Sequence, residues 1–442
     1  MNLSVIQNQS KQIASASSFS LASDVQNNIL LICQGNLGFY RETLPELDPD
    51  RISVVTLRDV ETLSLAETFK DVHYVEEYFL SGEVERIGYE ILKNKNFKLI
   101  IATSETDILR AAKLRDLFHL QGQSYESALY FRDKIRMKSL LKQGGIDVPE
   151  FARIKCALDV LSFIEKNPLP VIIKPARGYG SLQTRILRDY KDVQALLDTK
   201  GIFDEFQASD FDLERFVSTD MYHVDGIIRN GQVAVIWPSK CINNCLQMIE
   251  GKPTGGYLLE SENPLVAIIN NFAIKVLKAL PSPADFGFHL ELFIEDNKPI
   301  FCEIASRIGG PWINDLWVNG MGIDLKREFV RAQAALPFSA SITQMTPSKI
   351  TGGIIFPPKK GKILSIPNVC SLEGVVKYSP LVKIGAELDN PQGMLGHIAA
   401  FTISADSESE MLETIKSVQI WVKEHIVICS EVTEEKHSAS LL

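Results

Sequence analysis

The stretch that decides the fold is FHLELFIEDNKPIFCEIASRIGG, residues 288–310. Apolar and polar residues alternate on both sides of a short polar segment, which is the pattern of an antiparallel hairpin. A hairpin centred on Asn297 places Glu291 directly opposite Glu303, since the two positions average to 297. Like charges that face each other on a sheet are destabilising. We therefore predict a cation between the two carboxylates, whose hard oxygens suit a Mg²⁺ ion that bridges substrate phosphates.

The residues after the second carboxylate also favour a phosphate ligand. Arg307 offers a planar fork of donors to phosphate oxygens, and Gly309 and Gly310 allow the backbone to come close to a ligand. Together with the hairpin, these residues predict a nucleotide-phosphate site.

A second candidate phosphate element is KPARGYGS, residues 174–181. Lys174 ends a predicted buried strand, 170–174, and Gly178, Gly180 and Ser181 form a turn whose N–H and hydroxyl groups can cradle phosphate oxygens. The segment is not a Walker A loop, because no G-x-x-x-x-G-K-[ST] occurs in the chain. A solvated hairpin tip is the alternative interpretation of the same residues.

Two further segments are candidates for contacts with a nucleotide. Lys134 begins a predicted amphipathic helix over 134–145, where Lys138 is a competing candidate one turn later and simple solvation is the alternative. Residues 212–217, DLERFV, read as an extended hinge that can offer backbone groups to a purine edge. A nearby acidic residue can accept hydrogen bonds from ribose hydroxyls, and Asp225 shares a strand face with His223.

The rest of the chain reads as several α/β and α+β units. Predicted strands at 28–33, 51–57 and 97–102 alternate with helical patterns at 84–94 and 108–120, which indicates a parallel α/β layer. Asn230-Gly231 turns a hairpin over 221–237. Residues 239–263, rich in Gly, Pro and Asn, are predicted to form a long loop that is either functional or simply a surface feature. Residues from 350 onward, with a helix at 408–424, suggest a further small α+β unit.

Composition excludes several classes of protein. The formal net charge of -9 over 442 residues argues against a nucleic-acid partner, and no apolar run approaches the roughly 20 residues of a membrane span. Seven scattered cysteines form no zinc pattern and indicate a reducing compartment, so we expect a cytoplasmic protein. The serine-rich residues 1–24 fit no secretory signal, and we expect a disordered tail there.

In their order along the chain, these motifs resemble the ATP-grasp superfamily over roughly residues 25 to 430, and 303–310 (EIASRIGG) is the most specific part. The resemblance implies an ATP-grasp fold made of four parts. These would be an N-terminal α/β (pre-ATP-grasp) domain at 25–130, a small lid subdomain at 131–216, a large subdomain with the metal site at 217–345, and a C-terminal α+β subdomain at 346–430. A flexible tail would follow at 431–442.

The same resemblance implies roles for individual residues. Lys134 and Lys174 would bind the ATP phosphates under a mobile loop, 178–181, and Arg307 would act with Lys174 in catalysis by stabilising the transferred phosphoryl group. Glu291 and Glu303 would hold Mg²⁺, for which Mn²⁺ is a possible substitute. Three hinge residues would frame the adenine and Asp225 would lie near the ribose; the hinge residues are Glu214, Phe216 and Val217. Ala305 departs from the pattern, because many members carry an Asn there as a third metal ligand.

Within the superfamily the chain resembles the L-amino-acid (dipeptide) ligases most closely. This implies an ADP-forming ligase that activates a carboxylate, that of an amino acid, as an acyl phosphate and joins it to an amine. The long segment at 239–263 would close over the intermediate. A biotin-carboxylase-like enzyme that uses bicarbonate and a non-catalytic ATP-binding module are the alternatives. Partners would be small-molecule carboxylate and amine substrates, with no nucleic acid or membrane, and the resemblance allows a homodimer.

Overall fold

A parallel sheet forms the first layer of the protein, as the sequence predicts. The computed structural model describes residues 28–59, 68–94, 96–203, 210–243, 245–310, 312–339, 346–391 and 396–429; the tails expected at 1–24 and 431–442 lie outside them. The strand order is β3-β2-β1-β4, with β1 (Asn28–Cys33), β2 (Ile52–Leu57), β3 (Asp71–Val75) and β4 (Phe97–Ala102). Near-continuous apolar strands of this kind need cover on both faces. One face packs on α4 (Glu83–Asn94) and α5 (Asp107–Phe118), and the other on α2 (Leu37–Thr43) and the distant α13 (Leu325–Gln333).

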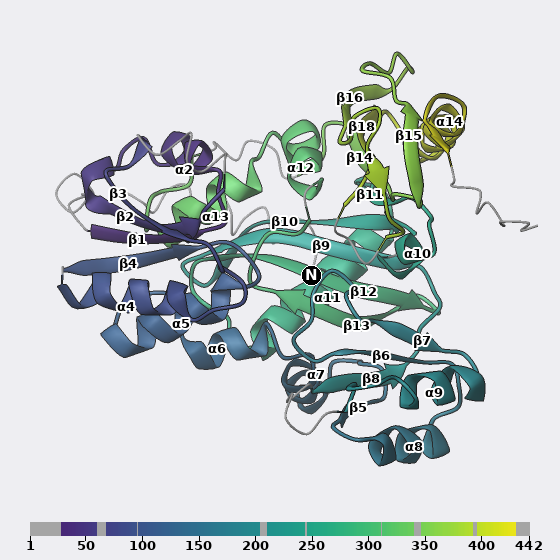
Figure 1. The fold of residues 1–442 in the computed structure, drawn as a ribbon, viewed down its shortest axis with the longest axis horizontal. Coiled ribbons are helices and arrows are strands. Elements are labelled where there is room, and N and C mark those ends of the chain that lie inside the picture. Colours follow the sequence, from purple (N-terminus) through teal and green to yellow (C-terminus); the bar gives the residue numbers. More distant parts are fainter. Residues whose placement is uncertain are drawn as a thin grey trace, which may run out of the picture.

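The second layer is an eight-stranded antiparallel sheet at the centre of the molecule (Figure 1). Its order is β13-β12-β9-β10-β11-β14-β18-β16. The strands are β9 (Met221–Arg229), β10 (Gln232–Ile242), β11 (Thr254–Leu258), β12 (Phe286–Glu295), β13 (Lys298–Ala305), β14 (Ile350–Phe356), β16 (Val375–Pro380) and β18 (Ala399–Ala405). Helices α11 (Leu265–Ala279) and α12 (Ile313–Met321) pack against this sheet, and their apolar residues join the largest core of the protein.

A small four-stranded sheet hangs below the central one in Figure 1 and has a core of its own. It consists of β5 (Phe151–Ile154), β8 (Phe211–Arg215), β6 (Val171–Pro175) and β7 (Arg185–Leu187), with α8 (Ala157–Lys166) and α9 (Tyr190–Leu197) packed on it. Helix α7 (Lys134–Gln143), expected to belong to this unit, instead packs Met137 and Leu141 into the core of the central sheet.

The prediction of a long loop over 239–263 is wrong. Ser239 to Ile242 continue β10, α10 (Cys245–Ile249) follows, and β11 pairs with both β10 and β14. The glycines that suggested a loop have a different cause, because β11 and β14 approach so closely that a Cβ on Gly255 would overlap the carbonyl oxygen of Gly353. Glycine inside a strand marks such a close backbone approach.

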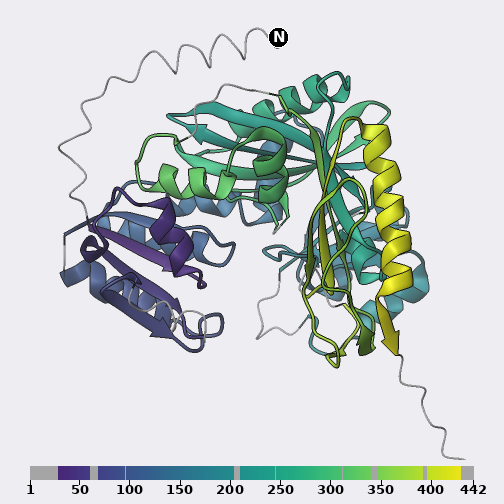
Figure 2. The same ribbon diagram turned by 90° about the horizontal axis from the view of Figure 1, so that it is seen from above.

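Strand β11 also changes the interpretation of the C-terminal residues. Through its pairing with β14, the strands β14, β18 and β16 extend the central sheet, so residues 346–430 share that sheet with the large subdomain. Helix α14 (Glu408–His425), yellow in Figure 2, packs against β14 and β18. The remaining elements are η1 (Pro49–Arg51), α6 (Tyr125–Tyr130) and a three-stranded sheet of β15 (Gly361–Ser365), β17 (Glu387–Leu388) and β19 (Val427–Cys429).

The two edges of the central sheet are finished differently. At β13 the N–H of Phe301 donates to the carbonyl oxygen of Asp147, 2.9 Å away. At the other edge, β16 ends at Pro380, and Lys377 forms a 2.8 Å ion pair with Asp315. Among the described helices, none combines the length and the apolar character that a bilayer span requires.

Candidate active site

The predicted pairing of the two carboxylates is confirmed. Glu291 of β12 lies opposite Glu303 of β13. The turn is two residues long, Asp296 and Asn297, both in the left-handed conformation with φ of 49° and 59°, and Glu295 pairs with Lys298. A regular hairpin with this turn would put position 302 opposite Glu291. A bulge at Cys302 adds one residue and restores the register, so Phe301 faces the core while Glu303 faces the site.

Glu291 and Glu303 belong to a row of polar side chains that crosses four strands. In register, Ser239 of β10 lies opposite His223 of β9, His223 lies opposite Glu291, and Glu291 lies opposite Glu303. We call these four residues the polar row. The Oγ atom of Ser239 and Nε2 of His223 are buried and have no hydrogen-bond partner among the described residues. The ring of Trp312 contacts His223 edge-on at 5.5 Å and closes this end of the row.

The protein itself supplies cations to both carboxylates. Lys134 lies 3.0 Å from Glu303, and His289 Nε2 lies 3.4 Å from Glu291. Burial alone would raise the pKa of Glu303, but Lys134 and Lys174 outweigh it and lower that pKa to about 2. The side chains of Glu291 and Glu303 remain 19% and 32% exposed, so a divalent cation can reach both. Two accessible carboxylates with hard oxygens fit Mg²⁺.

The ribose role expected for Asp225 does not fit its surroundings. Asp225 is fully buried, and both of its oxygens are engaged, by His223 at 2.6 Å and by His289 at 2.9 Å. Burial lowers the pKa of His289, but Asp225 and Glu291 more than offset this and raise it to about 10. A protonated His289 therefore lies between Asp225 and Glu291. These two histidines and Asp225 also form a group with metal-ligand geometry, although Asp225 is already satisfied by hydrogen bonds.

Lys174 and Glu214 lie in one buried ion cluster. Lys174 Nζ is 2.6 Å from Glu214, and Lys138 forms ion pairs with both Glu214 and Asp212. Lys138 and Asp212 are fully buried, and Glu214 is nearly so. Burial lowers the pKa of Lys174, but the attraction of Glu214 dominates and holds the pKa well above its ordinary value. Lys138, the competing candidate on α7, is thus a structural partner of Glu214, while Lys134 faces the carboxylates.

The glycine-rich segment is tied to the start of α7. The Lys134 N–H donates to the Ala176 carbonyl at 2.9 Å, and Lys134 Nζ donates to the Gly178 carbonyl at 2.7 Å. Gly180 and Ser181 both have positive φ, 60° and 57°, so the chain turns sharply at these two residues. The structure therefore brings Lys134, the glycine-rich turn and Glu303 together.

The hinge expected to contact adenine follows β8 directly. Phe216 is half-buried and its N–H donates to the Pro170 carbonyl at 3.3 Å, while Val217 is buried. Glu214 starts this segment from within the ion cluster. Of the three residues, Glu214 contacts Lys174 of the neighbouring strand β6, whereas Phe216 lies beside Pro170 at the other end of that strand.

Arg307 is held by a residue that the sequence did not single out. Its Nε pairs with Glu105, which follows β4 in the first layer and also pairs with Arg132. Burial raises the pKa of Glu105, but Arg307 and Arg132 outweigh it, and the pKa lies below its ordinary value. Ser306 points away from the metal carboxylates and donates to Gln123 at 3.0 Å. No local pattern marks Glu105, because its partner lies 202 positions away.

The chain is similar in sequence and in fold to several known proteins. No protein-family model matches the chain. An L-arginine-specific L-amino acid ligase from Bacillus subtilis is 25% identical over 396 residues, which cover 86% of this chain and 92% of that protein. The crystal structure of an L-amino acid ligase from Bacillus licheniformis has a TM-score of 0.69 at 18% identity and covers 92% of this chain and 99% of that one.

A third similar protein shares the fold but not the chemistry named for the first two. The biotin carboxylase domain of the 2-oxoglutarate carboxylase from Hydrogenobacter thermophilus, solved as a dimer with MgADP, ADP and bicarbonate, has a TM-score of 0.64 at 14% identity. It covers 91% of each chain. At such identities the solved structures speak for the fold alone. The chain therefore has the ATP-grasp fold, and it is similar to L-amino acid ligases over most of its length.

Proposed function

We propose that the protein activates the carboxylate of an amino acid with ATP and joins it to an amine, releasing ADP and phosphate. The observation that carries the proposal is the in-register pair Glu291 and Glu303 with Lys134 ion-paired to it. The similarity to an L-amino acid ligase over 86% of the chain supports the choice of substrate class. ATP as a substrate and thiols without a metal pattern make the cytoplasm the expected compartment.

The chain's own residues divide the binding of ATP between the small and central sheets. Lys134 and Lys174 bind the phosphates, and the backbone of Gly178, Gly180 and Ser181 covers them. Glu214, Phe216 and Val217 frame the adenine from the hinge. Glu291 and Glu303 would hold Mg²⁺, or Mn²⁺ in its place, which would supply positive charge to offset that of the phosphate oxygens.

The reaction has two steps. A carboxylate oxygen attacks the γ-phosphorus of ATP and ADP leaves, which gives an acyl phosphate; the amine nitrogen then attacks the acyl carbon and phosphate leaves. Arg307 donates to the transferred phosphoryl group, for which it exchanges one partner, Glu105. Donors placed where charge develops stabilise the transition state more than the ground state.

The polar row suggests where the substrate groups lie. Ser239 and His223 continue the row beyond Glu291 and keep a hydroxyl and a ring nitrogen without partners under Trp312. Buried polar atoms without partners are costly, and a polar group of the substrate would satisfy them. We assign this end of the row to a substrate and not to the nucleotide, because the lysines lie at the other end.

The decisive experiment measures phosphate release from ATP and Mg²⁺ with single amino acids and amino-acid pairs, and identifies products by mass spectrometry. A pair that triggers release and gives a product mass equal to the two minus water supports the ligase. Release with bicarbonate alone would instead indicate a carboxylase, and no release with any pair would contradict ligation of amino acids.

The carboxylate assignment has its own matched pair of variants. Glu303→Gln should reduce phosphate release by at least about 100-fold, because one charged metal ligand is lost. Glu295→Gln alters a carboxylate of the same hairpin whose ion pair is with Arg215, at 3.4 Å, and should leave the rate within about twofold. Equal rates in both variants, with unchanged Mg²⁺ dependence, would remove Glu303 from the metal site.

A further inference from the structure

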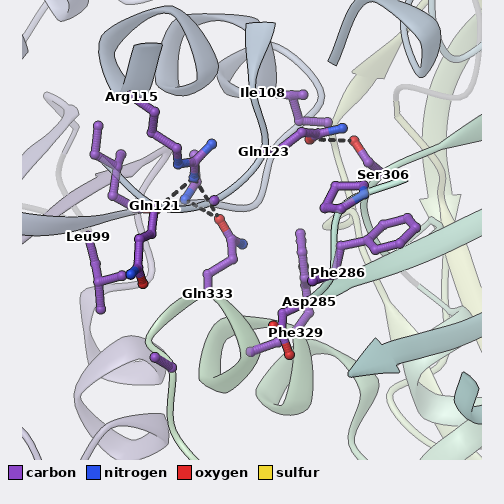
Figure 3. A pocket seen from close by; sticks show the side chains of 17 residues that line it. Leu99, Ile108, Arg115, Gln121, Gln123, Asp285, Phe286, Ser306, Phe329 and Gln333 are labelled. Carbon is purple, nitrogen blue, oxygen red and sulfur yellow. Dashed lines mark hydrogen bonds between the residues drawn. The ribbon is translucent and has the colours of Figure 1, made fainter. Parts of the chain in front are cut away.

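A cavity of about 250 Å³ lies between the first layer and the central sheet, apart from the metal carboxylates (Figure 3). Its walls come from β4, α5, the 121–123 loop, the start of β12 and α13, and neither Glu291 nor Glu303 lines it. The volume is below the 300–1,000 Å³ that drug-sized ligands occupy, so it suits a small metabolite.

One side of the cavity holds a guanidinium without a carboxylate. Arg115 of α5 is 5% exposed. Its Nη2 donates to the Ile100 carbonyl at 2.7 Å and to the Gln333 side-chain oxygen at 3.2 Å, and both of these acceptors are neutral. Within the described ranges no Asp or Glu lies within ion-pair distance of it, and its Nε has no hydrogen-bond partner. Burial lowers the pKa of Arg115 to about 10, and the nearby charge of Asp116 offsets this only in part. A buried cation with so little compensation is costly, which makes an anionic ligand a favourable partner.

The side-chain amide of Gln333, on the same side of the cavity, also has a donor without an acceptor among the described residues. Figure 3 shows Arg115 and Gln333 directed toward each other across the cavity wall, where the Gln333 oxygen is occupied by Arg115 and by the Ala102 N–H at 3.1 Å. The Gln333 Nε2 is buried and has no partner among the described residues. Gly122 lies so close over Arg115 that a Cβ would come 2.8 Å from its Nε, and its φ of 119° suits glycine.

The other walls combine apolar and neutral polar side chains, and among the described residues that line the cavity Arg115 is the one cation. The apolar side chains are Leu99, Ile108, Phe286, Phe329 and Ala332, and the neutral polar ones are Gln121, Gln123 and Ser306. Asp285 also lines the cavity, but it accepts from Arg229 at 2.8 Å and from the Asn230 N–H at 3.2 Å. A single cation suits a single carboxylate, and a phosphate would bring more charge than these walls neutralise.

We propose that this cavity binds a small aliphatic monocarboxylate, with its carboxylate on Arg115 and Gln333 and its tail against Ile108, Phe286 and Phe329. The source is either a free carboxylic acid or the carboxylate of an aliphatic amino acid. The site does not depend on the proposed ligase reaction. It shares a wall with the active site, because Ser306, which lines the cavity, directly precedes Arg307.

The test titrates 4-methylpentanoate and, separately, L-leucine into the full chain without ATP, by calorimetry and by thermal unfolding. Saturable binding that raises Tm is the expected result. Binding of both probes identifies the carboxylate and tail as sufficient, and binding of L-leucine alone identifies an amino acid as the source. No saturable binding of either probe would overturn the proposal.

Variants place the bound probe. Arg115→Met should weaken binding at least about tenfold, because a charged hydrogen-bond partner is lost. Since Arg115 also ties β4 to α13, Ala332→Leu is the second variant; it fills the cavity, keeps those hydrogen bonds and should abolish binding. Lys113→Met, on the exposed side of the same helix, and Glu303→Gln should both bind as the unaltered chain does. Binding that survives Ala332→Leu but is lost in Glu303→Gln would locate the probe in the active site and refute the cavity.

Discussion

The buried ion cluster around Lys138 has consequences for single substitutions. Lys138 contacts Asp212 and Glu214, and all three are almost without solvent. Removing one partner of a buried pair leaves an uncompensated charge, which costs about 3–5 kcal/mol. We therefore expect Lys138→Met to lower the free energy of unfolding by that amount in urea titrations.

The same helix provides the control for this substitution. Lys142 pairs with Glu150 at 3.0 Å, but both side chains are more than half exposed, and surface ion pairs contribute about 0–1 kcal/mol. Lys142→Met should therefore change the free energy of unfolding by less than about 1 kcal/mol. Similar losses in the two variants would show that the cluster contributes no more than a surface pair.

Glu105 predicts a pH dependence of stability. Its pKa in the folded protein is below the ordinary value of 4.5, because Arg307 and Arg132 outweigh its burial. A carboxyl group with a depressed pKa stabilises the fold above its ordinary pKa, and this contribution is lost as the pH falls through the folded value. The difference in unfolding free energy between the unaltered chain and Glu105→Gln should therefore shrink as the pH falls below about 4.5.

Urea titrations at a series of pH values from 7 to 3 measure this difference. Glu126→Gln, on an exposed position of α6, is the control and should differ little from the unaltered chain at every pH. A difference for Glu105→Gln that grows toward low pH would contradict the direction of the pKa shift.

The sequence predicts residues that follow one another in a pattern and misses those brought together by the fold. Glu291 and Glu303 were paired correctly, although the true turn centre lies half a residue away and the Cys302 bulge compensates for it. Asp225 was assigned to a ribose on the basis of the family resemblance, yet burial and its two histidines give it other partners. Glu105 and Arg115 carry no local signal, because their environment comes from segments more than 200 positions away.

At the scale of elements, β11 is a strand that the sequence analysis predicted to be part of a loop. A glycine-rich stretch predicts a loop from propensity alone, but here the glycines allow two backbones to meet. Strands with periodic or continuous apolar residues, such as β1 and β4, agree with their predicted bounds to the residue. Patterned burial is therefore visible in the sequence, whereas the close pairing of two glycine-containing strands is not.

The close pairing of β11 with β14 can be tested with an added methyl group. Gly255→Ala would drive a Cβ into the Gly353 carbonyl, and forced overlap in a packed region costs about 1–3 kcal/mol. We expect lower thermal stability and faster amide hydrogen exchange in β11 and β14. Gly82→Ala, where a Cβ meets nothing within 4 Å, should show neither effect. Equal exchange in the two variants would contradict the close approach of β11 and β14.

At the scale of the whole molecule, the continuous central sheet joins parts that the sequence divided at position 345. Strand β14 lies between β11 and β18, so a cut there removes one neighbour from each half of the sheet. Helix α13 likewise leaves the central sheet to cover the first layer. The resemblance to a family gave the fold class, but the pairing of strands across a boundary depends on contacts far apart in sequence.

Truncation measures how far the parts depend on one another. A chain that ends at residue 345 would expose the edge of β11 and the core residues that β14 covers, including Tyr257 and Leu316, which are buried in the intact protein. We expect it to aggregate or to unfold without cooperativity, as judged by circular dichroism melting. A truncated chain with a sharp transition and retained ATP binding would show that residues 346–430 are an independent unit.

The finish of strand β16 bears on how copies of this protein assemble. The free edge of a sheet is a template for the backbone of another chain unless it is obstructed. Pro380 offers no N–H at the end of this edge, and Lys377, bound to Asp315, places a charge along it. If two β16 edges paired with each other, Lys377 of one copy would lie close to Lys377 of the other, and the like charges would repel. We therefore expect that copies of the chain do not pair through this edge to form one continuous sheet. A homodimer would instead form through helices and loops. At high expression levels, this strand should not start the growth of cross-β fibres.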